Sequence, residues 1–156
     1  MDNPLKILPL IWRARRPSHI VDMPVLRNGF WLSKNYAGLT FFGHIITGSE
    51  KHAKMFAEKD NRMRNHEMIH LRQAQSTHNS WLLFYLLYGW YYLLALPQNR
   101  KMKNAAYWLN PFEMEAYRHD HDLHYLDNNE ATEWREYARM SPRQRREKYG
   151  FSNYAQ

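Results

Sequence analysis

The sequence has 156 residues, a length that predicts one domain around one hydrophobic core. Hydrophobic residues make up 44% and aromatic residues 15% of it, which excludes disorder of the whole chain. The formal charge of +7 is compatible with nucleic acid, anionic membrane or acidic substrates. However, the excess gathers in two short runs, 13–16 and 139–148, which we interpret as solvated surface.

The sequence contains no cysteine, so a disulfide framework is excluded and any transition-metal site must use His, Asp or Glu. The first ten residues include Asp2, Pro4, Lys6 and Pro9. These residues interrupt the apolar run that a signal peptide requires, so a cytoplasmic protein is expected.

The first third of the chain predicts little regular structure. Residues 1–36 carry four prolines and no clear periodicity, which indicates an irregular N-terminal wrap with room for a short strand. Residues 39–47 are β-branched and aromatic, and this run predicts a strand that ends at Gly48. The polar stretch 48–61 predicts a loop or a short helix, and Asp60 and Asn61 are candidate caps for the next element.

Residues 62–77 contain no Gly or Pro, and their composition favours a helix. Met63, His66, His70 and Gln73 recur at steps of three and four residues. These side chains therefore share one face of the predicted helix.

Residues 81–96 form an unbroken apolar and aromatic run that ends at Pro97. A helix that is apolar on all sides is either buried or in lipid, and this run is shorter than the roughly 20 residues that span a bilayer. Our first interpretation is a buried partner of the preceding helix. The alternative is interfacial or re-entrant membrane contact through 81–96.

The last third of the chain predicts several helices. After a polar loop, Asn110 and Pro111 predict the start of a helix, as N-cap and first helical residue, that runs to about residue 126. Residues 130–139 have a helical composition, and Ser141 and Pro142 predict one last basic helix.

The sequence HEMIH at positions 66–70 predicts a zinc site. His66 and His70 lie one helical turn apart, so both imidazoles can reach one metal ion at about 2.0–2.1 Å. Glu67 stands next to the first ligand, where it can take a proton from a metal-activated water. The alternative is an ordinary amphipathic helix with two surface histidines.

A catalytic zinc ion needs three protein ligands, and the best candidates for the third lie in the sequence NPFEMEAY at positions 110–117. The two motifs together resemble the gluzincin branch of zinc metallopeptidases, and more narrowly small bacterial and phage proteins with HExxHxxQ and NPxExEA helices. The resemblance implies that His66, His70 and Glu113 are zinc ligands and that Glu67 is the general base. It also implies that an edge strand pairs with an extended substrate.

Two alternatives stay open for the second motif. Glu113 lies three residues after Asn110 and could cap the helix, and in that case Glu115 would be the third ligand. If Glu113 is the ligand, Glu115 is expected in solvent or in a salt bridge. The resembling peptidases carry an aspartate that orients a ligand histidine, and Tyr117 stands at that place here.

Other histidines are interpreted as ordinary polar residues. The cluster at 119–124 predicts a polar helix face, although His121 and His124 are spaced so that they could bind a second metal weakly. His44 is expected to be half-buried in the strand, and Gln73 to lie near the zinc site.

These observations predict a mainly α fold with a small β element: a compact zincin-like helical domain with an edge strand or hairpin beside the HExxH helix. One domain is expected over 1–156, with the N-terminal wrap (1–36), a metal-binding core (39–126) and C-terminal basic helices (127–156). The predicted function is a zinc-dependent hydrolase, in particular a metallopeptidase acting on a peptide or protein. The alternative is a non-catalytic zinc-binding structural or interaction protein, and no specific nucleic acid is expected.

Overall fold

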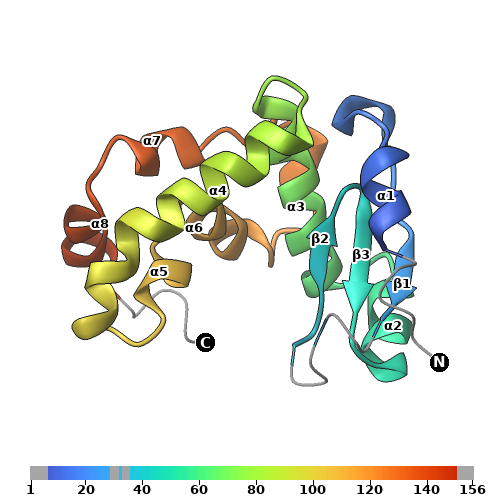
Figure 1. The fold of residues 1–156 in the computed structure, drawn as a ribbon, viewed down its shortest axis with the longest axis horizontal. Helices are drawn as coiled ribbons and strands as arrows, with labels where there is room; N and C mark the ends of the chain where they lie inside the picture. Colours follow the sequence, from blue (N-terminus) through green and yellow to red (C-terminus); the bar gives the residue numbers. More distant parts are fainter. Residues whose placement is uncertain (1–6, 29–31, 33–35, 151–156) are drawn as a thin grey trace.

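The computed structural model describes residues 7–28, 32 and 36–150, in which helices dominate and three short strands form one sheet (Figure 1). This confirms the predicted mainly α fold with a small β element. In chain order the elements are α1 (Leu8–Trp12), the 3₁₀ helix η2 (Pro17–His19), β1 (Val25–Arg27), β2 (Leu39–Phe41), β3 (His44–Thr47), α2 (Glu50–Ala57), α3 (Arg62–Ser76), α4 (Trp81–Ala95), the 3₁₀ helix η3 (Leu96–Arg100), α5 (Ala105–Trp108), α6 (Pro111–His119), the 3₁₀ helix η4 (Tyr125–Asp127), α7 (Trp134–Ala138) and α8 (Pro142–Tyr149).

Residues 39–47, whose composition predicted a strand, form a hairpin of β2 and β3, which is one of the two forms that the fold prediction named. Phe42 and Gly43 form the turn, and both have positive φ angles, as a two-residue hairpin loop of type I′ requires. The sheet order is β1-β3-β2, with β1 parallel and β2 antiparallel to β3. The hairpin places Thr40 against α3, with its side chain buried.

The N-terminal segment is more regular than predicted. Its expected short strand is β1, whose residues Val25, Leu26 and Arg27 pair with β3. Helices α1 and η2, which periodicity did not predict, precede it. The loop or short helix expected over 48–61 contains α2, whose N-cap Ser49 accepts a hydrogen bond from the backbone N–H of His52.

Helix α3 is the central element and contacts α2, α4, α6 and β2. Asn61 caps its N-terminus by accepting a hydrogen bond from the backbone N–H of Met63, as predicted. Nine of its 15 residues are buried, so both metal-binding candidates lie on an element that packing holds from several sides. The main core cluster consists of Met23, Ile45, Phe56, Leu71, Ala74, Trp81, Phe84, Phe112 and Trp134.

Helix α4 crosses the molecule from the sheet side to α5 and α8 (Figure 1). One of its faces packs into the core through Trp81 and Phe84. The opposite face is exposed, which corrects the expectation of a helix buried on all sides. Among the described residues, no helix is both long enough and apolar enough to cross a bilayer.

Helix α6 ends at His119, several residues before the predicted end near 126. The side chain of Asn65 on α3 donates from Nδ2 to the carbonyl oxygens of Asp120 and Asp122, at 2.9 and 3.0 Å. These carbonyls are therefore satisfied by another helix rather than by a further turn of α6.

In the C-terminal part, one of the two predicted helices starts later than predicted. Helix α7 begins at Trp134 rather than at residue 130, because Ala131 has a positive φ angle. Helix α8 starts at the predicted place with a capping box formed by Ser141 and Gln144. Arg145 is an exception to the predicted solvated run, because it is buried and donates from Nη1 to the carbonyl oxygen of Tyr137.

Candidate metal centre

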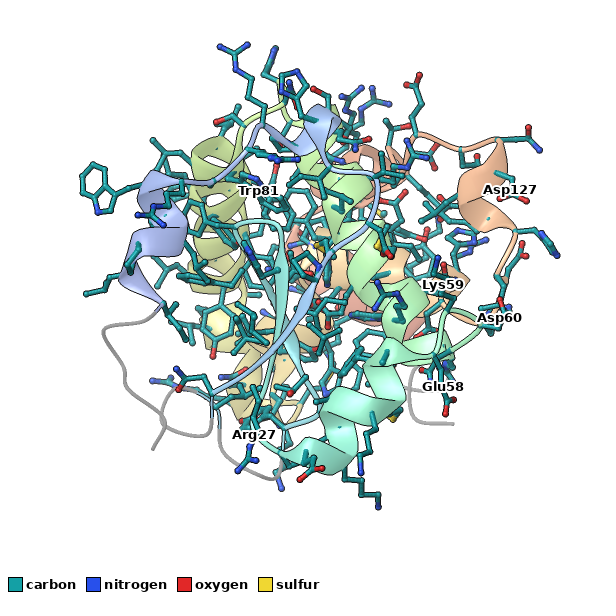
Figure 2. All side chains as sticks on the ribbon, turned by 90° about the vertical axis from the view of Figure 1, so that its right-hand side faces the viewer. Arg27, Glu58, Lys59, Asp60, Trp81 and Asp127 are labelled. Carbon is teal, nitrogen blue, oxygen red and sulfur yellow. The ribbon has the colours of Figure 1, made fainter. Side chains whose placement is uncertain are left out.

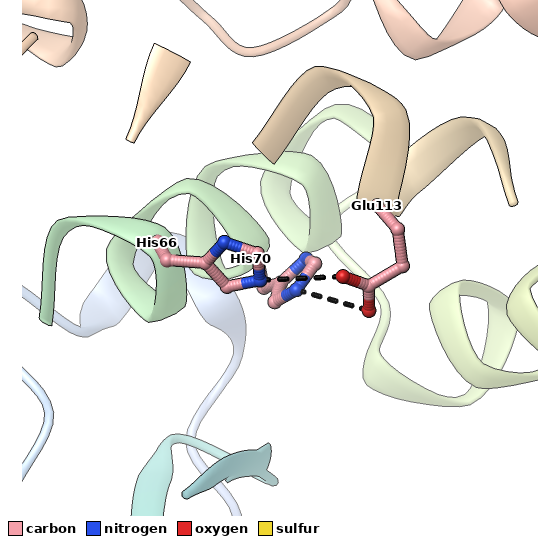
Figure 3. A group of neighbouring side chains, drawn as sticks. All are labelled: His66, His70 and Glu113. Atoms are coloured by element: carbon pink, nitrogen blue, oxygen red, sulfur yellow. Dashed lines mark ion pairs between the residues drawn. The ribbon is translucent and has the colours of Figure 1, made fainter. Parts of the chain in front are cut away.

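Three of the predicted side chains converge between α3 and α6 (Figure 3). Nε2 of His66 lies 3.3 Å from Oε2 of Glu113, and Nε2 of His70 lies 3.5 Å from Oε1. One candidate ligand atom from each residue lies within 4.8 Å of the other two, and all three residues are buried. This His-His-Glu group has the donor types and the spacing that can hold a metal ion.

The hydrogen bonds of Gln73 determine which nitrogen His70 presents to the group. Nε2 of Gln73 donates to the carbonyl oxygen of Phe112 at 2.9 Å and to Oε2 of Glu115 at 2.8 Å. Its Oε1 therefore accepts from Nδ1 of His70, at 2.8 Å. Gln73 thus engages Nδ1 of His70, and Nε2 is the ring nitrogen that faces Glu113.

His66 is oriented by two residues that follow Glu113 in the sequence. Nδ1 of His66 lies 3.5 Å from Oδ2 of Asp120, a buried carboxylate that also accepts from Nε of Arg62 at 2.8 Å. The ring of Tyr117 packs edge-on against His66, with the ring centroids 4.4 Å apart. The resembling peptidases orient a ligand histidine with an aspartate, and Tyr117 stands at that position here. In this structure Asp120 is the carboxylate that faces His66.

Glu113 carries a buried carboxylate oxygen, Oε2, that lies 3.3 Å from Nε2 of His66. Its Oε1 accepts from the hydroxyl of Tyr88 at 2.7 Å, whereas its buried Oε2 has no hydrogen-bond partner among the described residues. A buried carboxylate oxygen without a donor is costly unless a cation lies beside it. The donor set therefore fits a metal ion bound by two imidazoles and one carboxylate.

The same carboxylates shift the protonation of the histidines. Burial lowers the pKa of His66, but Asp120 and Glu113 outweigh burial and raise this pKa to about 10. Burial likewise lowers the pKa of His70, and Glu113 raises it above its ordinary value. Burial raises the pKa of Glu113, and the two histidines bring it below its ordinary value. Protons and a metal ion would therefore compete for the same ring nitrogens.

Glu67 lies on α3 beside this group and is held by the hairpin. Its Oε2 accepts a hydrogen bond of 2.6 Å from Oγ1 of Thr40 on β2. The hydroxyl of Tyr85 on α4 in turn donates to the carbonyl oxygen of Thr40 and accepts from the N–H of Phe42, each at 3.0 Å. The predicted strand therefore does lie beside the HExxH helix, and two main-chain groups near its turn are bonded to α4.

The structure separates the two glutamates of the second motif. Glu113 does not form the capping box with Asn110, whose backbone N–H donates to the carbonyl oxygen of Tyr107. Glu115 lies outside the His-His-Glu group and is not a solvent residue. Its fully buried carboxylate accepts from Gln73, from the hydroxyl of Tyr125 and from the backbone N–H groups that begin α7, those of Glu133 and Trp134.

Sequence reasoning missed Asp120, Thr40 and Tyr88. Asp120 could have been found, because it lies seven residues after Glu113 and therefore on the same face of a continuing helix. No local signal marks Thr40 or Tyr88, which reach Glu67 and Glu113 from other elements.

The histidines near the end of α6 do not form a second centre. His121 and His124 are exposed, and His119 lies 2.6 Å from Oε2 of Glu133. Within residues 7–28, 32 and 36–150, the His-His-Glu group is the one set of three or more metal-ligating side chains close enough to hold an ion.

Comparisons with protein-family models, with curated proteins and with solved structures found no match. The class of site is therefore defined by its own geometry: a buried group of two histidines and one glutamate that can hold a metal ion.

Proposed function

We propose that the protein is a zinc-dependent hydrolase, in particular a metallopeptidase that acts on a peptide or protein. The observation that carries the proposal is the convergence of His66, His70 and Glu113, three buried residues whose candidate ligand atoms lie within 4.8 Å of one another. Two neutral imidazoles and a carboxylate, without sulfur, suit Zn²⁺ and leave a coordination position open. When bound, the ion would lower the pKa of a coordinated water toward about 7.

In this proposal Glu67 accepts a proton from the attacking water and passes it to the leaving amine. The hydrogen bond from Thr40 to Oε2 fixes the carboxylate of Glu67 while the hairpin holds Thr40. Tyr88 fixes Glu113 in the same way from α4. These contacts support preorganised positions for both carboxylates.

The hairpin also supports a place for the substrate. An extended peptide that pairs with β2 would take over the main-chain groups of Thr40 and Phe42 that the Tyr85 hydroxyl now bonds. Two main-chain hydrogen bonds with the substrate would thus replace the two that β2 and its turn now make with the Tyr85 hydroxyl.

The second candidate function is a non-catalytic zinc-binding structural or interaction protein. The specific observation in its favour is burial: the His-His-Glu group, Glu67 and Thr40 are all buried, and Thr40 occupies one oxygen of the general base. A zinc ion enclosed in this way would stabilise the fold without reaching a substrate. The cytoplasmic location expected from the first ten residues stays a prediction under either function.

Metal analysis together with a peptide-library assay tests the proposal. We expect one zinc ion per chain in the purified protein, retained zinc without hydrolysis in Glu67→Gln, and loss of zinc in Glu113→Gln. Glu50→Gln, on the exposed side of α2, is the matched control and should keep both. Undiminished hydrolysis in Glu67→Gln would refute the role of Glu67, and bound zinc without any cleavage by the wild type would establish the second candidate function.

A further inference from the structure

The outer face of α4 carries large apolar side chains that nothing in the described structure covers. Leu82, Leu86, Trp90 and Leu93 are 66%, 61%, 57% and 60% exposed. Their spacing places them along one side of the helix, over about three turns. Gly89 lies between them, and a Cβ atom added there would meet open space. A contiguous apolar strip of this kind marks an interaction surface.

Helix α1 extends the same side of the molecule. Figure 2 shows α1 and the N-terminal half of α4 on one side, with η4 and Asp127 on the opposite side. The segment that follows α1 is bonded to the start of α4, because Nε1 of Trp81 donates to the carbonyl oxygen of Arg15 at 3.0 Å. Trp12 is 88% exposed, and Leu8 and Ile11 are also exposed. The apolar surface therefore has two parts, which we call the α1–α4 face.

The charged side chains of the segments that contain α1 and α4 are all basic. The sequence has no Asp or Glu between Glu67 and Glu113, and none from residue 3 to residue 21. Exposed basic residues flank the two helices instead: Arg13, Arg15 and Arg16 after α1, and Arg100, Lys101 and Lys103 after α4. Arg15, Arg16 and His78 also line a pocket of about 450 Å³ at the N-terminal end of α4.

We propose that the α1–α4 face docks on the surface of an anionic lipid bilayer, with α4 lying in the interface. Leucine and tryptophan side chains on one face and basic residues at its borders are the features that bind helices to anionic lipid surfaces. A second copy of the chain fits less well, because a symmetric dimer through this face brings the same basic clusters together. An anionic bilayer supplies both negative headgroups for the basic residues and an apolar layer for the leucine and tryptophan side chains.

This docking can be measured apart from metal binding, although both involve α4. The inner side of α4 supplies Tyr85 to the hairpin and Tyr88 to Glu113, so the His-His-Glu group would lie one helix away from the lipid. Metal content and membrane binding can therefore be measured separately on the same full-length protein.

Sedimentation with vesicles tests the proposal. We expect the protein to bind vesicles of phosphatidylcholine mixed with phosphatidylglycerol, to bind pure phosphatidylcholine vesicles much more weakly, and to be released by salt. The double substitution Leu86→Lys with Leu93→Lys should weaken binding to the mixed vesicles about tenfold or more. Its control is Leu123→Lys, an exposed leucine close to η4.

A second pair of variants tests the charge. Arg15→Ala with Arg16→Ala should weaken binding to mixed vesicles several-fold, since each basic residue near the surface adds attraction. Lys51→Ala with Lys54→Ala on α2 removes the same charge away from the α1–α4 face and should have little effect (Figure 2).

Circular dichroism and zinc content should be unchanged in all these variants, and Leu86→Gln with Leu93→Gln replaces the lysine pair if that pair unfolds. Three results would overturn the proposal: no binding by the wild type, equal binding after the leucine substitutions, or equal binding to neutral vesicles. Dimerisation in solution that Leu86→Lys abolishes, without vesicle binding, would assign the face to a second copy instead.

Discussion

Each histidine of the candidate metal centre has one ring nitrogen engaged by a neighbouring side chain and the other directed at Glu113. Gln73 engages His70 and Asp120 engages His66, so the donor atoms are oriented before any metal ion arrives. Such outer contacts determine affinity because they remove the cost of ordering the ligands on binding.

Replacing Asp120 by asparagine should therefore weaken zinc binding. Asp120→Asn keeps the shape of the side chain but removes the charge that faces His66 and Arg62. We expect zinc affinity to fall about 10–100-fold, as for other residues that orient metal ligands. Competition against a chromophoric chelator measures this affinity. The exposed Asp127→Asn serves as the control, and an unchanged affinity in Asp120→Asn would contradict the orienting role.

At the scale of residues, much of the site could be predicted from spacing. The positions of His66 and His70 follow from helical periodicity, and Glu113 from the resemblance of two short motifs. Whether Glu113 faces the histidines or caps its own helix depends on how α6 packs on α3, which no local pattern encodes. Asp120 was interpreted as part of a polar face, because the partners that bury it come from α3.

Among the elements, the hairpin shows why the strand prediction was incomplete. Residues 39–47 lack the Asn-Gly or Asp-Gly pair that usually announces a two-residue turn. Phe42 takes an unusual left-handed conformation where its ring packs on Tyr85 and Trp81 and its N–H bonds the Tyr85 hydroxyl. Contacts from α4 therefore support a turn that the local sequence disfavours.

Helix boundaries in the second half have the same origin. Asn65 satisfies the carbonyl groups beyond α6, and Glu115 satisfies the N–H groups that start α7. Composition alone predicted a later end for α6 and an earlier start for α7. The side chains that satisfy the main-chain groups at these two ends, Asn65 and Glu115, come from other parts of the chain.

Two glycines of these elements should respond to alanine in opposite directions. Gly89→Ala should raise the free energy of unfolding by about 0.5–1 kcal/mol, because it lies inside α4 with open space beside it. Gly43→Ala should lower it by about 1–2 kcal/mol, because its φ of +84° favours glycine and the new Cβ atom would lie 2.5 Å from Cδ1 of Ile20. Urea unfolding measures both values. Destabilisation by Gly89→Ala would contradict the exposed position of this residue.

On the scale of the whole molecule, a bound metal ion would join α3 to α6, two helices that also share core contacts with α4. The sequence predicted this helical core around a small sheet. The parts it did not predict, namely the turn, the helix ends and the buried Asp120, all depend on contacts between distant segments.

Zinc should stabilise the protein, and more so at higher pH. A free concentration of zinc about a thousandfold above Kd adds roughly 4 kcal/mol to the free energy of unfolding. The gain should shrink as pH falls from about 8 to 6, because His66, with a pKa of about 10, and His70, with a raised pKa, hold protons that the metal must displace. Calorimetric melting with zinc or with a chelator measures the difference.

The metal-free protein should show the opposite trend for His66. A pKa raised from 6.5 to about 10 adds stability that is fully present below about pH 6.5 and is lost as pH rises toward 10. Glu113→Gln should abolish the zinc response and serves as the control. A zinc effect that is the same at every pH would contradict direct ligation by these histidines.

Helix α4 links the surface of the protein to its interior. Tyr85 and Tyr88 lie on the side that faces the hairpin and Glu113, and the leucines lie on the other. Because a helix moves as a stiff rod, a load on the leucines also displaces the two tyrosine hydroxyls. Whatever the protein rests against is thereby mechanically connected to Thr40 and Glu113.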